Sequence, residues 1–270
     1  MPRGEGAEGE TAQYSQPGKV TLVGAGPGDP ELLTLRAVKA LRGARLVLYD
    51  HLVSKDVLRY VAEDADLIYV GKQAGHHTIP QEEIIELMVR LASDGRSMVR
   101  LKGGDCFIFG RGGEEAQGLE RAGIPFEIVP GISAAQGAGA YAGIPLTHRD
   151  HAATLVYATG HLRGANDADL DWAMLARPRQ TVVFYMGIGN LPVICGELQR
   201  HGMRADMPAA LVEHATLPGQ RCICGTLQTL PQLALDHHVK PPALIIVGEV
   251  VSLHETLSRG MATPASLLEG

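Results

Sequence analysis

Short apolar runs alternate with amphipathic segments through the first half of the chain. The apolar runs predict strands over 19–24, 46–49, 67–70, 98–101 and 126–129. Between them, apolar residues recur at helical spacing, most clearly over 79–92, where Ile84, Met88 and Leu91 share one stripe. Strands that alternate with helices predict a mainly parallel sheet with right-handed crossovers.

The first helix has recognisable start and stop signals. Asp29 is a suitable N-cap, and Pro30 suits the first helical position because its missing N–H would have no helical partner there. Gly43 marks the end of the helix. The apolar spacing predicts that Leu32, Leu35, Val38 and Leu41 face the core.

The second half begins a new strand pattern after a helix of small residues that opens at Ser133. Strands are expected over 154–158, 181–185, 209–212, 221–224 and 244–247. We therefore expect two α/β domains with mainly parallel sheets, over 19–130 and 131–257. Residues 1–18 are expected to be a disordered tail and 258–270 a C-terminal tail.

Composition and charge exclude several classes of function. A net charge of −6 and an aromatic content of 4% favour neither nucleic acid nor a membrane surface as a partner. Four cysteines without dense spacing fit a reducing compartment. The first 18 residues contain no apolar stretch of the kind that a secretory signal needs. A cytoplasmic protein is expected.

Two glycine-rich turns follow predicted strands and end in an acid. They are Gly24-Ala25-Gly26-Pro27-Gly28-Asp29 and Gly103-Gly104-Asp105. A dinucleotide fingerprint would need a third glycine where Asp29 stands, and Pro27 lacks an N–H that a pyrophosphate would use. No Walker ending is present. The acids favour a ligand without phosphate, whose hydroxyls or ammonium they could hold, while Lys102 is expected to point outward.

No metal site is expected from the cysteines and histidines. Cys222 and Cys224 alternate with Ile223 in a predicted strand and so share one face, but no second ligand pair has structural-zinc spacing. Cys106 is expected to be a buried small residue rather than a reactive thiol.

The segment 23–34, Val-Gly-Ala-Gly-Pro-Gly-Asp-Pro-Glu-Leu-Leu-Thr, resembles the N-terminal signature of the tetrapyrrole methyltransferase family. Further similar motifs lie at 50–53, 70–72, 103–112, 129–134, 185–187 and 242–250, so that the resemblance runs from Lys19 to Leu257. Cys106 departs from it, since the family usually has proline after Gly-Gly-Asp.

The resemblance implies that S-adenosylmethionine lies between the two domains and leaves as S-adenosylhomocysteine, without a metal. It maps the donor contacts onto Pro27, Gly103, Gly104, Asp105, Ile108, Ser133, Ala134, Met186, Ala215 and Ala243. The implied reaction methylates two ring carbons, C2 and C7, of uroporphyrinogen III through precorrin-1 to precorrin-2. Alternatives are a later cobalamin-pathway methyltransferase of the same fold and a nucleotide-binding regulatory module. The sequence leaves open whether the product is used for siroheme, cobalamin or haem d1.

The implied substrate carries eight carboxylates, which basic side chains would hold. Arg111 and Arg149 are the strongest candidates because guanidinium pairs with carboxylate in a bidentate way, and His148 and Met186 are further candidates. In the family pattern Asp50 is the candidate base and Lys72 the matching acid or charge stabiliser, or both only bind substrate. The family also implies a homodimer, to which the apolar run 242–251 could contribute an interface.

Overall fold

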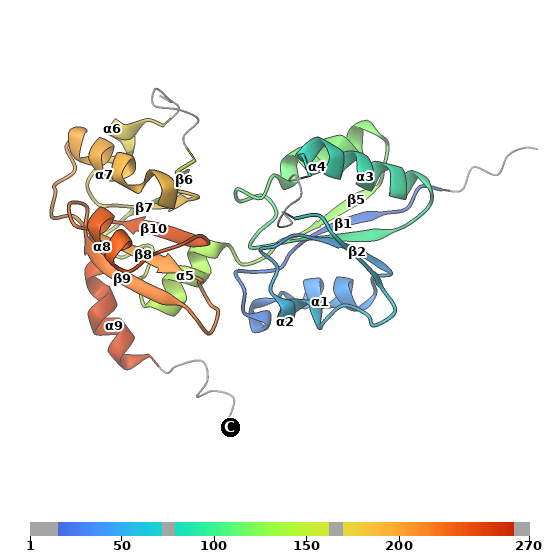
Figure 1. Ribbon diagram of the computed structural model, residues 1–270, viewed down its shortest axis with the longest axis horizontal. Coiled ribbons are helices and arrows are strands. Elements are labelled where there is room, and N and C mark those ends of the chain that lie inside the picture. The colour runs from blue at the N-terminus through green and yellow to red at the C-terminus, as the bar shows by residue number, and fades with distance from the viewer. Residues whose placement is uncertain (1–15, 72–78, 162–169, 262–270) are drawn as a thin grey trace, which may run out of the picture.

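The computed structural model describes residues 16–71, 79–161 and 170–261. It contains two five-stranded sheets, each between layers of helices, in two units that lie side by side (Figure 1). The first sheet has the order β3-β2-β4-β1-β5 and all of its pairs are parallel. Its strands are β1 (Val20–Gly24), β2 (Leu46–Tyr49), β3 (Asp66–Tyr69), β4 (Met98–Lys102) and β5 (Phe126–Val129).

Helices cover both faces of the first sheet (Figure 1), which explains why its strands are apolar at successive positions. Leu22 packs under α3 (Gln81–Ser93) and α4 (Gly112–Arg121). The next residue, Val23, packs against α1 (Leu35–Arg42) and α2 (Lys55–Leu58) on the other face. The carboxyl ends of these parallel strands are thus left as the open edge of the unit.

The first predicted helix is divided in two. Asp29 caps a 3₁₀ helix, η1 (Pro30–Leu32), as expected, but the chain then restarts as α1 with Thr34 as its cap. The Thr34 hydroxyl accepts the Ala37 N–H at 3.1 Å. This restart changes the helical phase, so the predicted apolar stripe is wrong at Leu35, which is 89% exposed.

The second sheet has the order β6-β7-β10-β8-β9. Its strands are β6 (Thr154–Thr159), β7 (Gln180–Tyr185), β8 (Pro208–Glu213), β9 (Arg221–Thr226) and β10 (Ala243–Val247). One face packs against α6 (Trp172–Leu175), α7 (Leu191–Arg200) and α8 (Leu230–Asp236). The other face packs against α5 (Ala134–Ala142) and η3 (Glu249–Leu253), which leads into α9 (His254–Gly260). A short 3₁₀ helix, η2 (Ile188–Asn190), follows β7.

The expectation of parallel strands is wrong for most of this second sheet. Only β6 and β7 are parallel, and the other three pairs are antiparallel. Residues 214–220 alone join β8 to β9, and this is shorter than the dozen or so residues that a parallel crossover needs. The run 242–251 contains β10, the central strand, so its apolar side chains serve the core and not an interface.

The small-residue helix α5 shares its core with the second sheet, through Ala135 and Ala138 packed near Val183. Helix α9 continues to Gly260, three residues past the expected boundary at 257. It does so because Leu257, Ser258 and Met261 pack closely over Gly143. Most of the two expected tails lies outside the described residues. Across the described ranges, no helix has the length and apolar character that crossing a membrane requires.

Candidate active site

Three glycine turns meet at the carboxyl edge of the first sheet. Gly26 and Gly104 exchange backbone hydrogen bonds of 3.1 and 2.7 Å, which joins the turn after β1 to the turn after β4. A Cβ on Gly131, after β5, would lie 2.4 Å from the Gly104 carbonyl oxygen, and one on Gly24 would lie 2.5 Å from the Gly131 nitrogen. Only glycine permits this contact of backbone with backbone, so the three turns form one continuous floor.

The acidic side chains of these turns accept hydrogen bonds from neighbouring segments and so hold the loops in place. Asp105 accepts the Phe107 N–H at 2.8 Å and the Gly131 N–H at 3.1 Å. Asp29 caps η1 and accepts the Tyr141 hydroxyl at 2.5 Å. The expectation that these acids are free for a ligand is therefore incomplete, because each first holds its own chain. Each carboxylate has about four acceptor sites, which leaves capacity for a ligand hydroxyl or ammonium.

The second unit contributes its own loops to the same place. Thr216, in the loop after β8, accepts the Asp29 N–H at 3.0 Å. A Cβ on Gly137 of α5 would lie 2.5 Å from Pro27 and 2.9 Å from Thr216. Ser133 closes a capping box with Gln136 and so fixes the start of α5 beside the glycine floor. The joint between the two units thus consists of the Asp29 loop, Thr216 and the start of α5, where the Ala134 nitrogen lies near Gly104.

Left-handed backbone marks the loops at this joint. Met186 follows β7 with φ 56° and is 55% exposed, while His214 (φ 49°) and Thr216 (φ 65°) flank Ala215. Non-glycine residues in this conformation cost energy and cluster at functional sites. The structure therefore brings Met186 and Ala215 to one edge of the second sheet, with Ala243 at the start of β10 beside them.

An apolar rim lies beside the glycine floor. The Phe109 ring packs against Tyr185 at 4.7 Å between ring centroids, and the Tyr185 hydroxyl accepts the Ala135 N–H at 3.1 Å. This chain of contacts joins the loop of Ile108 to the residues around Met186. Phe109 also lines an apolar pocket of about 220 Å³ with residues of β6 and α6. The joint thus offers apolar surface next to polar backbone.

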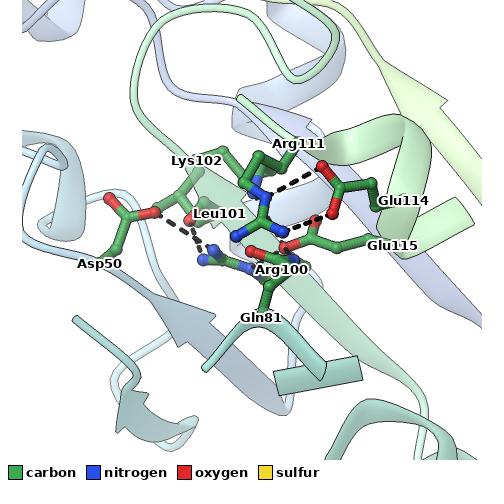
Figure 2. Close-up of polar contacts among 8 residues, drawn as sticks. All are labelled: Asp50, Gln81, Arg100, Leu101, Lys102, Arg111, Glu114 and Glu115. Atoms are coloured by element: carbon green, nitrogen blue, oxygen red, sulfur yellow. Dashed lines mark hydrogen bonds and ion pairs between the residues drawn. The ribbon is translucent and has the colours of Figure 1, made fainter. Parts of the chain in front are cut away.

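A buried charged cluster lies at the end of β4, directly before the Gly103-Gly104 turn (Figure 2). One oxygen of Glu115, which is 0% exposed, accepts from Arg100 at 3.1 Å, from Lys102 at 2.9 Å and from Gln81 at 3.0 Å. Burial, together with the neighbouring Arg100 guanidinium, lowers the pKa of Lys102. The other Glu115 oxygen, Oε2, has no hydrogen-bond partner among the described residues.

The expectation that Lys102 points outward is wrong, since its exposed fraction is 4%. The sequence signal that could have shown this is the alternation Arg100-Leu101-Lys102 inside a strand with both faces covered. A charge at such a position must find a partner of opposite charge. The partner, Glu115, lies on α4, and no local sequence spacing predicts that it pairs with Lys102.

Of the candidate catalytic pair, Asp50 and Lys72, only Asp50 lies within the described residues. Asp50 follows β2, and its carboxylate pairs with Arg100 at 3.2 Å and accepts the Leu52 N–H at 3.1 Å (Figure 2). Asp50 therefore lies at the edge of the buried cluster, with 20% of its side chain exposed. Lys72 lies outside the described residues.

The structure does not bring the candidate substrate residues together. Arg111, with φ 58°, directly precedes α4 and forms a bidentate pair with Glu114 at 2.9 and 2.5 Å (Figure 2). This hydrogen bonding raises the pKa of Arg111 and the pair lowers the pKa of Glu114. His148 and Arg149 precede β6, where Arg179 donates to the Arg149 carbonyl at 2.8 Å.

Strand topology explains the separation. Arg179 precedes β7 and Met186 follows it. Arg149, which Arg179 contacts, therefore lies at the opposite end of the strands from Met186. Six residues of strand at about 3.3 Å each place these two ends roughly 20 Å apart. Cys106, in contrast, lies where it was expected, fully buried, and burial raises the pKa of its thiol to about 12.

Comparison with protein families and with curated proteins gives consistent results. The family model of the Tetrapyrrole (Corrin/Porphyrin) Methylases matches residues 19–231. A siroheme synthase of Thioalkalivibrio sulfidiphilus is 59% identical over 240 residues, covering 89% of this chain and 49% of that protein. A siroheme synthase of Nitrosomonas europaea is 54% identical over 254 residues, covering 94% and 53%. The chain thus spans about half the length of the curated relatives it matches.

Solved structures show the same fold. Uroporphyrin III C-methyl transferase from Thermus thermophilus is 43% identical with a TM-score of 0.74, covering 87% of this chain and 100% of that one. A structure of the same enzyme complexed with S-adenyl homocysteine matches equally well. A cobalt precorrin-4 methyltransferase has a TM-score of 0.77 at 28% identity, covering 90% of this chain and 99% of that one.

Proposed function

This chain belongs to the tetrapyrrole (corrin/porphyrin) methylase family, and on that premise we propose that it methylates two ring carbons of uroporphyrinogen III, giving precorrin-2. S-adenosylmethionine is the methyl donor and S-adenosylhomocysteine the product. The observation that carries the proposal is the joint of glycine turns in a chain 43% identical to uroporphyrin III C-methyl transferase along that enzyme's whole length.

The joint suits this donor better than a nucleotide. Above Gly104, whose φ is +67°, a Cβ would find its nearest neighbour, the Ala134 nitrogen, at 3.6 Å, so the backbone is open to a ligand. At the first turn of α5, the Ala134 N–H faces this opening and is proposed to hold the donor carboxylate. The remaining acceptor capacity of Asp105 suits ribose hydroxyls or the ammonium. The proposed donor contacts are Pro27, Gly103, Gly104, Asp105, Ile108, Ser133, Ala134, Met186, Ala215 and Ala243.

The proposed chemistry is nucleophilic transfer. An electron-rich pyrrole carbon attacks the sulfonium methyl in line, so that a C–C bond forms while the S–CH₃ bond breaks. The methylated ring is cationic and loses a proton. The chain supplies orientation in the joint, with the apolar rim of Ile108, Phe109 and Met186 excluding water from the reactants. Asp50 is the carboxylate proposed to take the proton, and Arg111 is proposed to hold a substrate carboxylate.

Incubation of the full chain with methyl-labelled S-adenosylmethionine and uroporphyrinogen III tests the proposal. A dimethylated product is expected. The fold match to cobalt precorrin-4 methyltransferase makes a later precorrin the alternative substrate, but the lower identity of 28% favours uroporphyrinogen III. Label transfer to a later precorrin with none to uroporphyrinogen III would overturn the assignment.

We also propose a cytoplasmic homodimer, as the family resemblance implies. The four free cysteines fit a reducing compartment. The exposed side chains of Leu35 and Leu235 offer apolar surface to a second copy. Light scattering of the purified chain is expected to give twice the monomer mass, and a monomer mass at all concentrations would contradict it.

A further inference from the structure

Two cysteines of the edge strand β9 and a histidine at the start of α9 form a cluster away from the glycine turns. Cys222 and Cys224 lie on one face of β9, while Ile223 between them packs in the core on the other face. The two Sγ atoms are 3.7 Å apart. These atoms and a ring nitrogen of His254 all lie within 4.8 Å of one another. The cluster stands where β9 and α9 meet, at the outer side of the C-terminal unit (Figure 1).

One ring nitrogen of His254 is held by the backbone, which leaves the other as the candidate ligand atom. Its Nδ1 bonds to the carbonyl oxygen of Ala142, at the end of α5. Because a carbonyl can only accept, Nδ1 carries the proton and Nε2 of the neutral ring keeps a lone pair. Histidines that bind metals usually donate their other N–H to a carbonyl or carboxylate in this way.

The sulfur spacing fits a tetrahedral metal better than a disulfide. Zinc binds thiolates at about 2.3 Å, so two sulfurs of a tetrahedral site lie about 3.8 Å apart. The observed separation is 3.7 Å. Residues two apart in an extended strand span about 6.6 Å between Cα atoms, near the upper limit for a disulfide. The strand therefore holds Cys222 and Cys224 at metal-binding distance without bending.

We propose that Cys222, Cys224 and His254 bind one Zn²⁺ ion, with solvent as the fourth ligand on the exposed side of Cys224. Two thiolates and an imidazole are a donor set that zinc prefers. The ion ties α9 to β9 and, through the Ala142 carbonyl, to the end of α5. It protects the sheet edge and has no part in methyl transfer.

Zinc titration of the full chain, prepared without a polyhistidine tag, reduced by a phosphine and stripped by chelator, tests this site. One equivalent of Zn²⁺ is expected to bind tightly in competition with a chromophoric chelator. Co²⁺ in its place is expected to give thiolate charge-transfer bands and the intense d–d bands of tetrahedral geometry. Cys224→Ser and His254→Gln should each weaken binding more than about 100-fold, since even loss of an outer-shell partner costs 10–100-fold.

Cys195→Ala is the matched control, because Cys195 is a buried thiol of the same unit in another core, and it should bind zinc like the parent. As a second readout, Zn²⁺ should slow amide exchange in α9 of the parent chain but not in Cys224→Ser. Absence of a tight equivalent, unchanged affinity in His254→Gln, or isolation of a Cys222–Cys224 disulfide that no phosphine reduces would each overturn the proposal.

Discussion

Asp50 forms an ion pair with Arg100, whose guanidinium is buried. Replacing Asp50 by asparagine keeps the shape and the acceptor for the Leu52 N–H but removes the basic group. If Asp50 takes the proton from the methylated ring, kcat should fall by about 10²–10⁴ while both ligands still bind. Steady-state rates and mass spectrometry, which would reveal monomethylated product, check this.

Asp56→Asn on α2 is the control for Asp50→Asn, because Asp56 pairs with Arg59 on the exposed surface and should leave kcat unchanged. Near-normal turnover of a folded Asp50→Asn chain would mean that solvent takes the proton and that Asp50 is only a positioning residue.

Arg111 is held by Glu114 in an exposed pair at the start of α4. A charged hydrogen bond to a substrate carboxylate is worth about 1.5–3 kcal/mol, so Arg111→Ala should raise the substrate KM by about tenfold or more. Donor affinity should stay constant. Arg121→Ala, at the other end of α4, is the control and should change neither. A change in donor affinity with an unaltered KM would show that Arg111 serves the donor.

Glu115 and its neighbour Glu114 give a matched pair of charge removals. Glu115→Gln leaves Arg100 and Lys102 without their buried anion, and breaking such a pair costs about 3–5 kcal/mol. Glu114→Gln removes an exposed ion pair worth about 0–1 kcal/mol. Denaturant unfolding should therefore show a large loss of stability only for Glu115→Gln. Equal losses would mean that the buried cluster contributes no more than a surface pair.

At the scale of single residues, the sequence predicts which side chains lie in the turns better than it predicts which side chains they contact. The glycines and acids of the turns could be identified locally because strand ends and turns have local signals. The partners could not, since Asp29 meets Tyr141 and Thr216 from another unit of the chain. The inward direction of Lys102 likewise depends on Glu115, a residue on the following helix.

Among the elements, the contact between glycine turns is the most sensitive to added volume. Gly131→Ala would place a Cβ 2.4 Å from a backbone oxygen, and such overpacking costs about 1–3 kcal/mol. If the turns form the donor site, S-adenosylhomocysteine should bind about 5–150-fold more weakly. Calorimetry measures this, with circular dichroism to verify folding.

Gly113→Ala is the control for Gly131→Ala, since a Cβ there meets nothing within 4 Å. Donor affinity equal to the parent in a folded Gly131→Ala chain would remove the turn after β5 from the donor site.

The apolar pattern predicts which segments are helices and which are strands. It predicts neither which face of a helix is buried nor whether a strand runs parallel to its neighbours. The strands of both sheets lie where the pattern predicts them. The restart of the first helix at Thr34 depends on one side-chain cap, which leaves Leu35 outside. The direction of β8, β9 and β10 depends on connection length and on which strand each one pairs with. Pairing is a long-range property that a local apolar pattern does not encode.

The two units of the molecule are joined by contacts at the proposed donor site itself. Thr216 of the second unit holds the Asp29 loop of the first, and Pro27 packs against Gly137 of α5. Asp105 anchors Gly131, at the start of the segment that crosses between the units. A ligand bound at this joint therefore touches both sheets, so its binding energy acts on the whole molecule.

S-adenosylhomocysteine should for this reason stabilise both units together. A ligand at 100 times its Kd that binds only the native state adds about 2.7 kcal/mol, which slows exchange of globally protected amides about 100-fold. Hydrogen exchange should show this protection in β4 of the first sheet and in β8 of the second. The gain should shrink in Gly131→Ala and persist in Gly113→Ala. Protection confined to the first sheet would place the donor on the N-terminal unit alone, and the joint would then serve only to hold the units together.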